Sequence, residues 1–307
     1  MVDMLDFLRS ENINESIIKG VEEFRAKYAV QEEDKKRIVE PRYHYFGKEV
    51  MEEAISALLC GENLLLVGAK ATGKNVLAEN LAAVFGRPHW NVSLHINMDA
   101  SFMLGADTFT NGNVVFRPGP VYKCATHGGF GILDEINMAR NEALAVLHSM
   151  LDYRRIIDVP GYDIIKIDEA TRFIATMNYG YAGTKELNEA LTSRFAVIKM
   201  PLVDKDNLTK LLTGEFPTMR PEMVEQFSGI FMDLEKKCEV AEISSKALDL
   251  RGLLDAISLM YKGLNPHLAL AMGITNKSFD EYEPGLIQDV IALHLPKNLT
   301  REQIFTD

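Results

Sequence analysis

Short apolar runs alternate with amphipathic helical stretches along the middle of the chain, from about residue 46 to residue 203. The runs have the length of strands, and the stretches between them are long enough for crossover helices. This alternation predicts an α/β fold in which helices cover a parallel sheet. Five runs fit one sheet: Leu64 to Val67, His89 to Leu94, Gly129 to Leu133, Phe173 to Thr176 and Ala196 to Ile198.

Two further segments predict β-hairpins set between these strands. Val114 to Phe116 lies beside the turn sequence Asn111-Gly112-Asn113, and the stretch from Arg155 to Ile165 surrounds Pro160-Gly161. Both turn sequences favour a tight reversal of the chain. We expect hairpins that project from such a core to contact partners.

The two ends of the chain carry helical patterns without strand signals. Behind a candidate cap at Asn14, apolar positions up to residue 24 fall on one helical face, which predicts an N-terminal helical extension over residues 1–45. Packing on its own body is favoured over binding a partner, because amphipathic helices usually serve a local core. Beyond residue 203, helical stripes follow Pro221 and Leu250, and they predict a separate helical domain over residues 204–307.

The composition is that of an ordinary globular protein, with 47% hydrophobic and 25% charged residues among 307. Because 44 acidic residues outnumber 33 basic ones, for a net charge of −11, a nucleic acid partner is not expected. No apolar run approaches the ~18 residues of a membrane-spanning helix, and the first residues lack a signal-peptide pattern. Scattered cysteines suit a reducing compartment. We therefore expect a cytoplasmic protein with no membrane contact.

The strongest motif, Gly68 to Asn75, follows the first predicted strand and opens a helical stretch. Its glycines let backbone N–H groups curl around phosphates, while Lys74 adds a fixed positive charge and the helix directs its positive end inward. The order of strand, loop and helix predicts a nucleotide-binding site. The expected nucleotide contacts are Gly68, Ala69, Lys70, Ala71, Thr72, Gly73, Lys74, Asn75 and Val76.

One position departs from the usual phosphate loop. Asn75 stands where serine or threonine normally offers a hydroxyl to Mg²⁺. A side-chain carbonyl oxygen is also a hard neutral ligand, so two interpretations stay open: Asn75 replaces the hydroxyl, or it holds a bridging water. We keep it as a candidate metal ligand.

A second motif, Phe130 to Glu135, is an apolar strand that ends in two carboxylates. A buried strand at this place delivers Asp134 to magnesium, and Glu135 then polarises the attacking water. Taken alone, an apolar run that ends in two acidic residues can also be the ordinary end of a strand. The phosphate loop in the same chain favours a functional role for the two carboxylates.

Two later residues complete the candidate site. Asn178 follows the fourth strand, where it either contacts the attacking water or the γ-phosphate, or bonds its own backbone as a loop amide. Arg194 precedes the last strand and is either a surface charge or an arginine finger for a neighbouring subunit. We favour the functional role for both and expect Glu135, Asn178 and Arg194 to be catalytic.

Together these residues resemble the AAA+ ATPases, and more narrowly the MoxR-like, dynein-related branch with the CbbQ, NorQ and GvpN type of activator. The resemblance runs from about Phe46 to about Met260, and its most specific parts are the phosphate loop and the segments Gly128 to Asp152 and Phe173 to Phe195. It implies a P-loop αβα sandwich with a five-stranded parallel sheet over residues 46–203, followed by a small helical lid. The loop becomes Walker A, Asp134 and Glu135 Walker B, Asn178 sensor 1 and Arg194 the finger.

The resemblance also implies roles outside these motifs. The hairpins look like the helix-2 insert and the pre-sensor-1 hairpin of that branch, and Arg251 looks like the sensor 2 contact to the γ-phosphate. Lys246 is a second candidate for sensor 2, and simple packing of the lid is the other interpretation of that helix.

Members of this branch generally form rings, commonly hexamers, and many remodel or activate a partner. Such partners often carry a von Willebrand A domain or a metal centre. The sequence thus predicts an ATPase that uses ATP and Mg²⁺ in a homo-oligomeric ring. Two alternatives stay open: a nucleotide-gated binding module with little turnover, and a relative that uses GTP or acts on DNA.

Overall fold

The computed structural model describes residues 3–158, 163–179 and 187–307 of the chain. Contacts divide the chain into two compact units: Met1–Ala69 together with Gly73–Pro201, and Lys70–Thr72 together with Leu202–Asp307. Residues 1–45 fall in the same unit as the sheet. The expected domain ranges stay a prediction.

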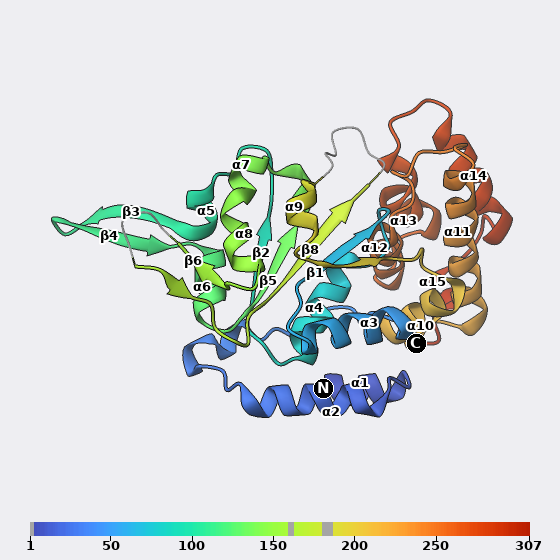
Figure 1. Ribbon diagram of the computed structural model, residues 1–307. Helices are drawn as coiled ribbons and strands as arrows, with labels where there is room; N and C mark the ends of the chain where they lie inside the picture. Colours follow the sequence, from blue (N-terminus) through green and yellow to red (C-terminus); the bar gives the residue numbers. More distant parts are fainter. Residues whose placement is uncertain (1–2, 159–162, 180–186) are drawn as a thin grey trace. The chain divides into compact units, whose positions relative to one another are not determined.

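The first unit is built on a five-stranded, all-parallel sheet with the order β2-β5-β8-β1-β9 (Figure 1), which confirms the predicted α/β class. The strands begin and end close to the predicted runs. Their bounds are β1 Leu64–Gly68, β2 His89–Ser93, β5 Phe130–Asp134, β8 Arg172–Asn178 and β9 Ala196–Lys199.

Two β-hairpins form separate two-stranded sheets in this unit. The first pairs β3 (Gly105–Thr110) with β4 (Asn113–Pro118) around a turn in which Asn111 and Gly112 both have left-handed φ angles, and it projects away from the sheet (Figure 1). The second pairs β6 (Ile156–Ile157) with β7 (Ile165–Lys166). Its predicted turn at Pro160-Gly161 lies outside the described residues.

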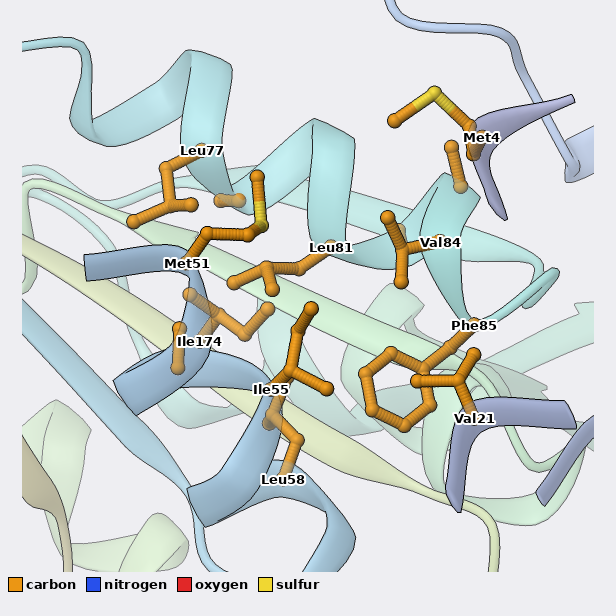
Figure 2. Close-up of a cluster of buried hydrophobic side chains, with 14 of the residues drawn as sticks. Met4, Val21, Met51, Ile55, Leu58, Leu77, Leu81, Val84, Phe85 and Ile174 are labelled. Carbon is orange, nitrogen blue, oxygen red and sulfur yellow. The ribbon is translucent and has the colours of Figure 1, made fainter. Parts of the chain in front are cut away.

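Helices cover both faces of the sheet, as the alternation along the strands requires. Leu64 and Leu66 join the core cluster of the helices that precede and follow β1, whereas Leu65 joins the cluster on the opposite face. Figure 2 shows the first cluster, where side chains of α3 and α4 interdigitate above β8. The helices of the first face are α1 Met4–Ser10, α2 Glu15–Lys27, α3 Lys48–Leu59 and α4 Lys74–Val84.

The N-terminal helices belong to this core. Asn14 caps α2 by accepting a hydrogen bond from the Ser16 backbone N–H, as predicted. Val21 and Phe24 of α2 are buried, and the Phe24 ring meets the Phe85 ring edge-on at 5.0 Å. The expected packing of this helix on its own body is confirmed.

Short helices cover the opposite face, where Cys124 is fully buried among apolar side chains. Burial raises the pKa of the Cys124 thiol, so this cysteine is a packing residue. The helices after β2 are α5 Ala100–Leu104, α6 Pro120–Thr126, α7 Asn141–Leu144, α8 His148–Leu151 and α9 Glu189–Thr192, with 3₁₀ turns η2 Ile136–Met138 and η3 Ala145–Leu147; a further turn, η1 Glu32–Arg37, precedes α3.

Residues 202–307 of the second unit are helical. Helices α12 and α13 approach closely because Gly252 and Gly273 face each other: a Cβ on Gly252 would lie 2.0 Å from the Gly273 carbonyl oxygen. No helix among the described residues is long and apolar enough to cross a membrane. The helices are α10 Lys205–Glu215, α11 Pro221–Glu239, α12 Leu250–Tyr261, α13 Pro266–Gly273, α14 Glu283–His294 and α15 Arg301–Ile304, with a 3₁₀ turn η4 Thr275–Lys277.

Candidate functional site

The carboxyl ends of β1, β5 and β8 meet at one edge of the sheet. The register pairs Gly68 of β1 with Asn178 of β8, and Leu133 of β5 with Ala175 of β8. Since all strands are parallel, the polar residues that end them gather at this edge. The sequence motifs, far apart along the chain, are therefore neighbours in the fold.

The phosphate loop leaves this edge directly from β1 and enters α4. Gly73 occupies the N-cap of α4 with a φ angle of 79°, and Ala71 also has a left-handed φ of 65°. These conformations turn the chain sharply, and the first N–H groups of an α-helix have no acceptor within the helix. The loop thus presents backbone donors and the positive end of a helix together.

Lys74 is the first residue of α4 and is 7% exposed. Its Nζ donates hydrogen bonds to the carbonyl oxygens of Gly68 at 3.0 Å and Ala69 at 2.6 Å. Burial lowers the pKa of Lys74 to about 8, and the nearby charges of Asp134 and Glu135 oppose this shift. A positive charge is thereby held between the loop and the acidic pair.

Asp134 ends β5, and each oxygen of its carboxylate accepts one hydrogen bond. The Asn75 side-chain N–H donates to Oδ2 at 3.1 Å, and the Thr176 hydroxyl donates to Oδ1 at 2.5 Å. Each oxygen keeps a further acceptor site, so the carboxylate can also take a hard cation such as Mg²⁺. The structure brings Asn75 and Asp134 together, and their ligation of metal stays a prediction.

Glu135 follows β5 in a left-handed conformation, with a φ angle of 55°. Its backbone N–H donates to the Thr176 hydroxyl at 3.1 Å, and its Oε1 accepts from the Asn178 side-chain N–H at 3.2 Å. The Asn178 amide therefore contacts the glutamate, and the backbone oxygen of Asn178 accepts from Asn137 at 3.0 Å. Asp134, Glu135 and Asn178 form one connected polar group.

Among the described residues, the polar contacts of Arg194 are with His148, Ala190 and Asp152, and none is with the polar group of Asp134, Glu135 and Asn178. Its Nε donates to the His148 carbonyl oxygen at 3.1 Å, its Nη1 donates to the Ala190 carbonyl oxygen, and its Nη2 lies 3.7 Å from an oxygen of Asp152. The guanidinium is thus anchored within its own chain. Its reach toward a neighbouring subunit stays a prediction.

The two candidates for sensor 2, Arg251 and Lys246, belong to the second unit. Lys70, Ala71 and Thr72 of the loop are grouped with this unit. Arg251 is the second residue of α12 and is exposed, while the Lys246 Nζ lies 6.0 Å from the centre of the Phe279 ring. The roles of Arg251 and Lys246 toward a phosphate stay predictions.

Thr176 and Asn137 take part in the polar group although the sequence motifs did not single them out. A signal for Thr176 exists in the alternation of β8: it lies two residues after Ile174, which joins the core of the α4 face. Thr176 therefore points to the face from which α4 carries Asn75. For Asn137 the sequence holds no comparable signal, because it lies in the irregular turn η2.

Comparisons with known proteins give a family profile and several relatives. The profile of the AAA domain (dynein-related subfamily) matches residues 63–195. The uncharacterized protein YojN of Bacillus subtilis is 32% identical over 253 residues, which cover 81% of this chain and 83% of YojN. An uncharacterized protein of Staphylococcus haemolyticus is 32% identical over 84% of this chain and 100% of its own length. A solved structure of a putative ATPase from Cytophaga hutchinsonii is 15% identical, covers 92% of this chain and 98% of that one, and has a TM-score of 0.47.

Proposed function

Because this chain belongs to the AAA family of ATPases, in its dynein-related subfamily, we propose that it binds ATP with Mg²⁺ and hydrolyses it to ADP and phosphate. The observation that carries the proposal is the polar group at the sheet edge. In this group the acidic pair Asp134 and Glu135, the Asn178 amide and the buried Lys74 lie beside the phosphate loop. This combination of charges serves phosphoryl transfer to water.

Each residue has a distinct part in this reaction. Lys74 and the loop N–H groups bind the phosphates, and Asn75 and Asp134 are the oxygen donors for Mg²⁺, which when bound neutralises phosphate charge. Glu135 accepts a proton from the attacking water. The water oxygen then forms a bond to the γ-phosphorus, and the bond between the γ-phosphorus and the oxygen of the leaving ADP breaks. Asn178 orients the Glu135 carboxylate through their hydrogen bond.

We propose that ATP hydrolysis drives the remodelling or activation of a partner protein in the cytoplasm. By its resemblance to the MoxR-like branch, the chain forms a homo-oligomeric ring, a hexamer, in which Arg194 of one subunit reads the γ-phosphate of the next. Arg251 acts as sensor 2, with Lys246 as the other candidate. The partner carries a von Willebrand A domain or is a metalloenzyme.

The hairpin of β3 and β4 offers a surface for such a partner. Phe109 is 77% exposed and Val114, directly opposite it, is 67% exposed. An exposed apolar pair on a projecting ribbon is typical of a protein contact. The net charge of −11 disfavours the alternative of a DNA-acting relative.

A second candidate function is a nucleotide-gated binding module with little turnover. The contact that favours it is the hydrogen bond from Asn75 to Asp134, in which the amide nitrogen, rather than an oxygen, faces the metal-directed carboxylate. Steady ATP turnover separates the two functions, since only the ATPase releases phosphate continuously.

The test of the proposed function uses Lys74→Ala and Glu135→Gln. Lys74→Ala should lose ATP affinity, because the phosphates lose their buried positive charge. Glu135→Gln should bind ATP with Mg²⁺ and fail to hydrolyse it, because the amide cannot take the proton. Nucleotide titration and phosphate release measure the two steps, and mass in solution with and without ATP tests the ring. Parent-like affinity in Lys74→Ala, or parent-like turnover in Glu135→Gln, would reject these roles.

A further inference from the structure

Thr176 occupies the central strand of the sheet at the level of the acidic pair. It is 1% exposed, and β8 lies between β5, which carries Asp134, and β1, which leads into the phosphate loop. Its side chain points toward the face covered by α4. A hydroxyl buried at this place needs partners for its donor and its acceptor, and both are found in two consecutive residues of the site.

The two hydrogen bonds of Thr176 have different directions. A hydroxyl has one proton to donate, and Thr176 donates it to Oδ1 of Asp134 at 2.5 Å. A lone pair of the same oxygen accepts the backbone N–H of Glu135 at 3.1 Å. One side-chain atom thus contacts both the metal-directed carboxylate and the backbone of the water-activating residue.

The bond to the Glu135 backbone matters because of that residue's conformation. A residue other than glycine at a φ of 55° is strained, and surrounding contacts must hold it there. The Thr176 hydroxyl supplies one such contact at the N–H of the strained residue itself. The turn directs the Glu135 side chain to Asn178, with 3.2 Å between Nδ2 of Asn178 and Oε1 of Glu135.

We propose that Thr176 is a positioning residue for hydrolysis: its hydroxyl fixes the Asp134 carboxylate and the Glu135 backbone relative to each other, so that the two acidic groups act as one unit. This proposal rests on the proposed ATPase function. The Thr176 hydroxyl acts through its hydrogen bonds to the Asp134 carboxylate and to the Glu135 backbone N–H. Losing it should slow the chemical step and leave nucleotide binding to Lys74 and the loop.

The chain offers a matched control at the other end of the same strand. Thr171, next to the first residue of β8, is fully buried, and its hydroxyl donates only to the backbone oxygens of Cys124 and Ala125. Thr176→Val and Thr171→Val therefore remove the same group from equally buried sites, one at the carboxylates and one remote from them. Thr176→Ser restores the hydroxyl without the methyl group.

The experiment measures kcat, KM and ATP affinity for the full chain and these three variants, with thermal unfolding as a check of folding. Thr176→Val should lower kcat by about 10- to 100-fold, the size expected for a mispositioned reacting group, with KM and ATP affinity within about threefold of the parent. Thr176→Ser should recover most of kcat. Thr171→Val should lose thermal stability but keep the parent kcat.

Several results would overturn the proposal while the ATPase function stands. They are a Thr176→Val kcat within threefold of an active parent, an equal loss in Thr176→Ser, and a loss confined to ATP affinity. An equal fall of kcat in Thr171→Val would also overturn it, since the effect would then be one of general stability. A parent that neither binds nor hydrolyses ATP would remove the proposed function, and the proposal with it.

Discussion

Asn80 links the helix of the phosphate loop to the segment that precedes the first sheet helix, and its removal should destabilise the first unit. The side chain lies on α4 and is fully buried. Its Oδ1 accepts the Tyr45 backbone N–H at 3.1 Å, and its Nδ2 donates to the carbonyl oxygens of Tyr43 and Val76, both at 2.8 Å. The Tyr45 ring in turn lies against Gly73 of the loop.

The cost of Asn80→Ala follows from the hydrogen bonds that it removes. The Tyr45 N–H and the Tyr43 carbonyl each lose a part-buried hydrogen bond, which costs about 0.5–1.5 kcal/mol per bond. Val76 loses less, because its carbonyl also lies within the hydrogen-bond ladder of α4, and alanine recovers about 0.5 kcal/mol through its helix propensity. The net loss of unfolding free energy should be about 1–3 kcal/mol. For a unit of this size, that lowers Tm by roughly 2–12 °C.

Thermal and urea unfolding of the parent, Asn80→Ala and a surface control measure this loss. Asn141→Ala is a suitable control, because Asn141 is exposed at the start of the short helix α7 and its replacement should change stability by less than about 0.5 kcal/mol. A loss below about 0.5 kcal/mol in Asn80→Ala, no larger than that of the control, would refute the reasoning. Such a result would mean that water or a shifted backbone satisfies the Tyr43 and Tyr45 groups.

Two further predictions concern the reaction. Asn75→Thr should preserve or raise turnover and change the magnesium concentration for half-maximal rate, since a hydroxyl replaces the amide beside Asp134; the parent's magnesium dependence would place Asn75 away from the ion. Arg194→Ala should bind nucleotide normally and lose turnover by about 10²-fold or more. Mixed rings with Lys74→Ala subunits should regain part of the activity, and co-assembled rings that stay inactive would contradict a shared site.

The strands of the sheet could be predicted because they are buried and short. Both faces of β1 and β5 are covered by helices, so their sequences are continuous apolar runs that stand out from the helical pattern. Their ends were less certain. β5 includes Asp134 and β8 extends to Asn178, because the backbones of these polar residues still pair with neighbouring strands.

The first hairpin shows why exposed strands escape such prediction. The sequence indicated Val114 to Phe116 and the Asn111-Gly112 turn, but β3 was not recognised as its partner strand. Most residues of that strand, Gly105–Thr110, are exposed, and the strand alternates weakly in hydrophobicity. Without a buried face, a strand has no pattern to detect.

The candidate site divides in the same way. Lys74, Asn75, Asp134 and Glu135 were predicted from local motifs, because strand, loop and helix follow one another along the chain there. The contacts of Arg194 could not be predicted in this way. Its partners His148 and Asp152 lie more than 40 positions earlier in the chain, at the two ends of α8, and the fold brings them to Arg194.

The polar group at the sheet edge has two parts, and a residue to which the sequence motifs assign no role joins them. Asn75 and Asp134 form the part directed at the metal, and Glu135 and Asn178 form the part directed at water. The only hydrogen-bonded atom common to both among the described residues is the Thr176 hydroxyl oxygen. The hydroxyl donates its proton to the Asp134 carboxylate and accepts the Glu135 backbone N–H, so a displacement of either group changes a hydrogen bond of the same oxygen atom. The spacing of the acidic pair is therefore set by the neighbouring strand as well as by the chain that carries it.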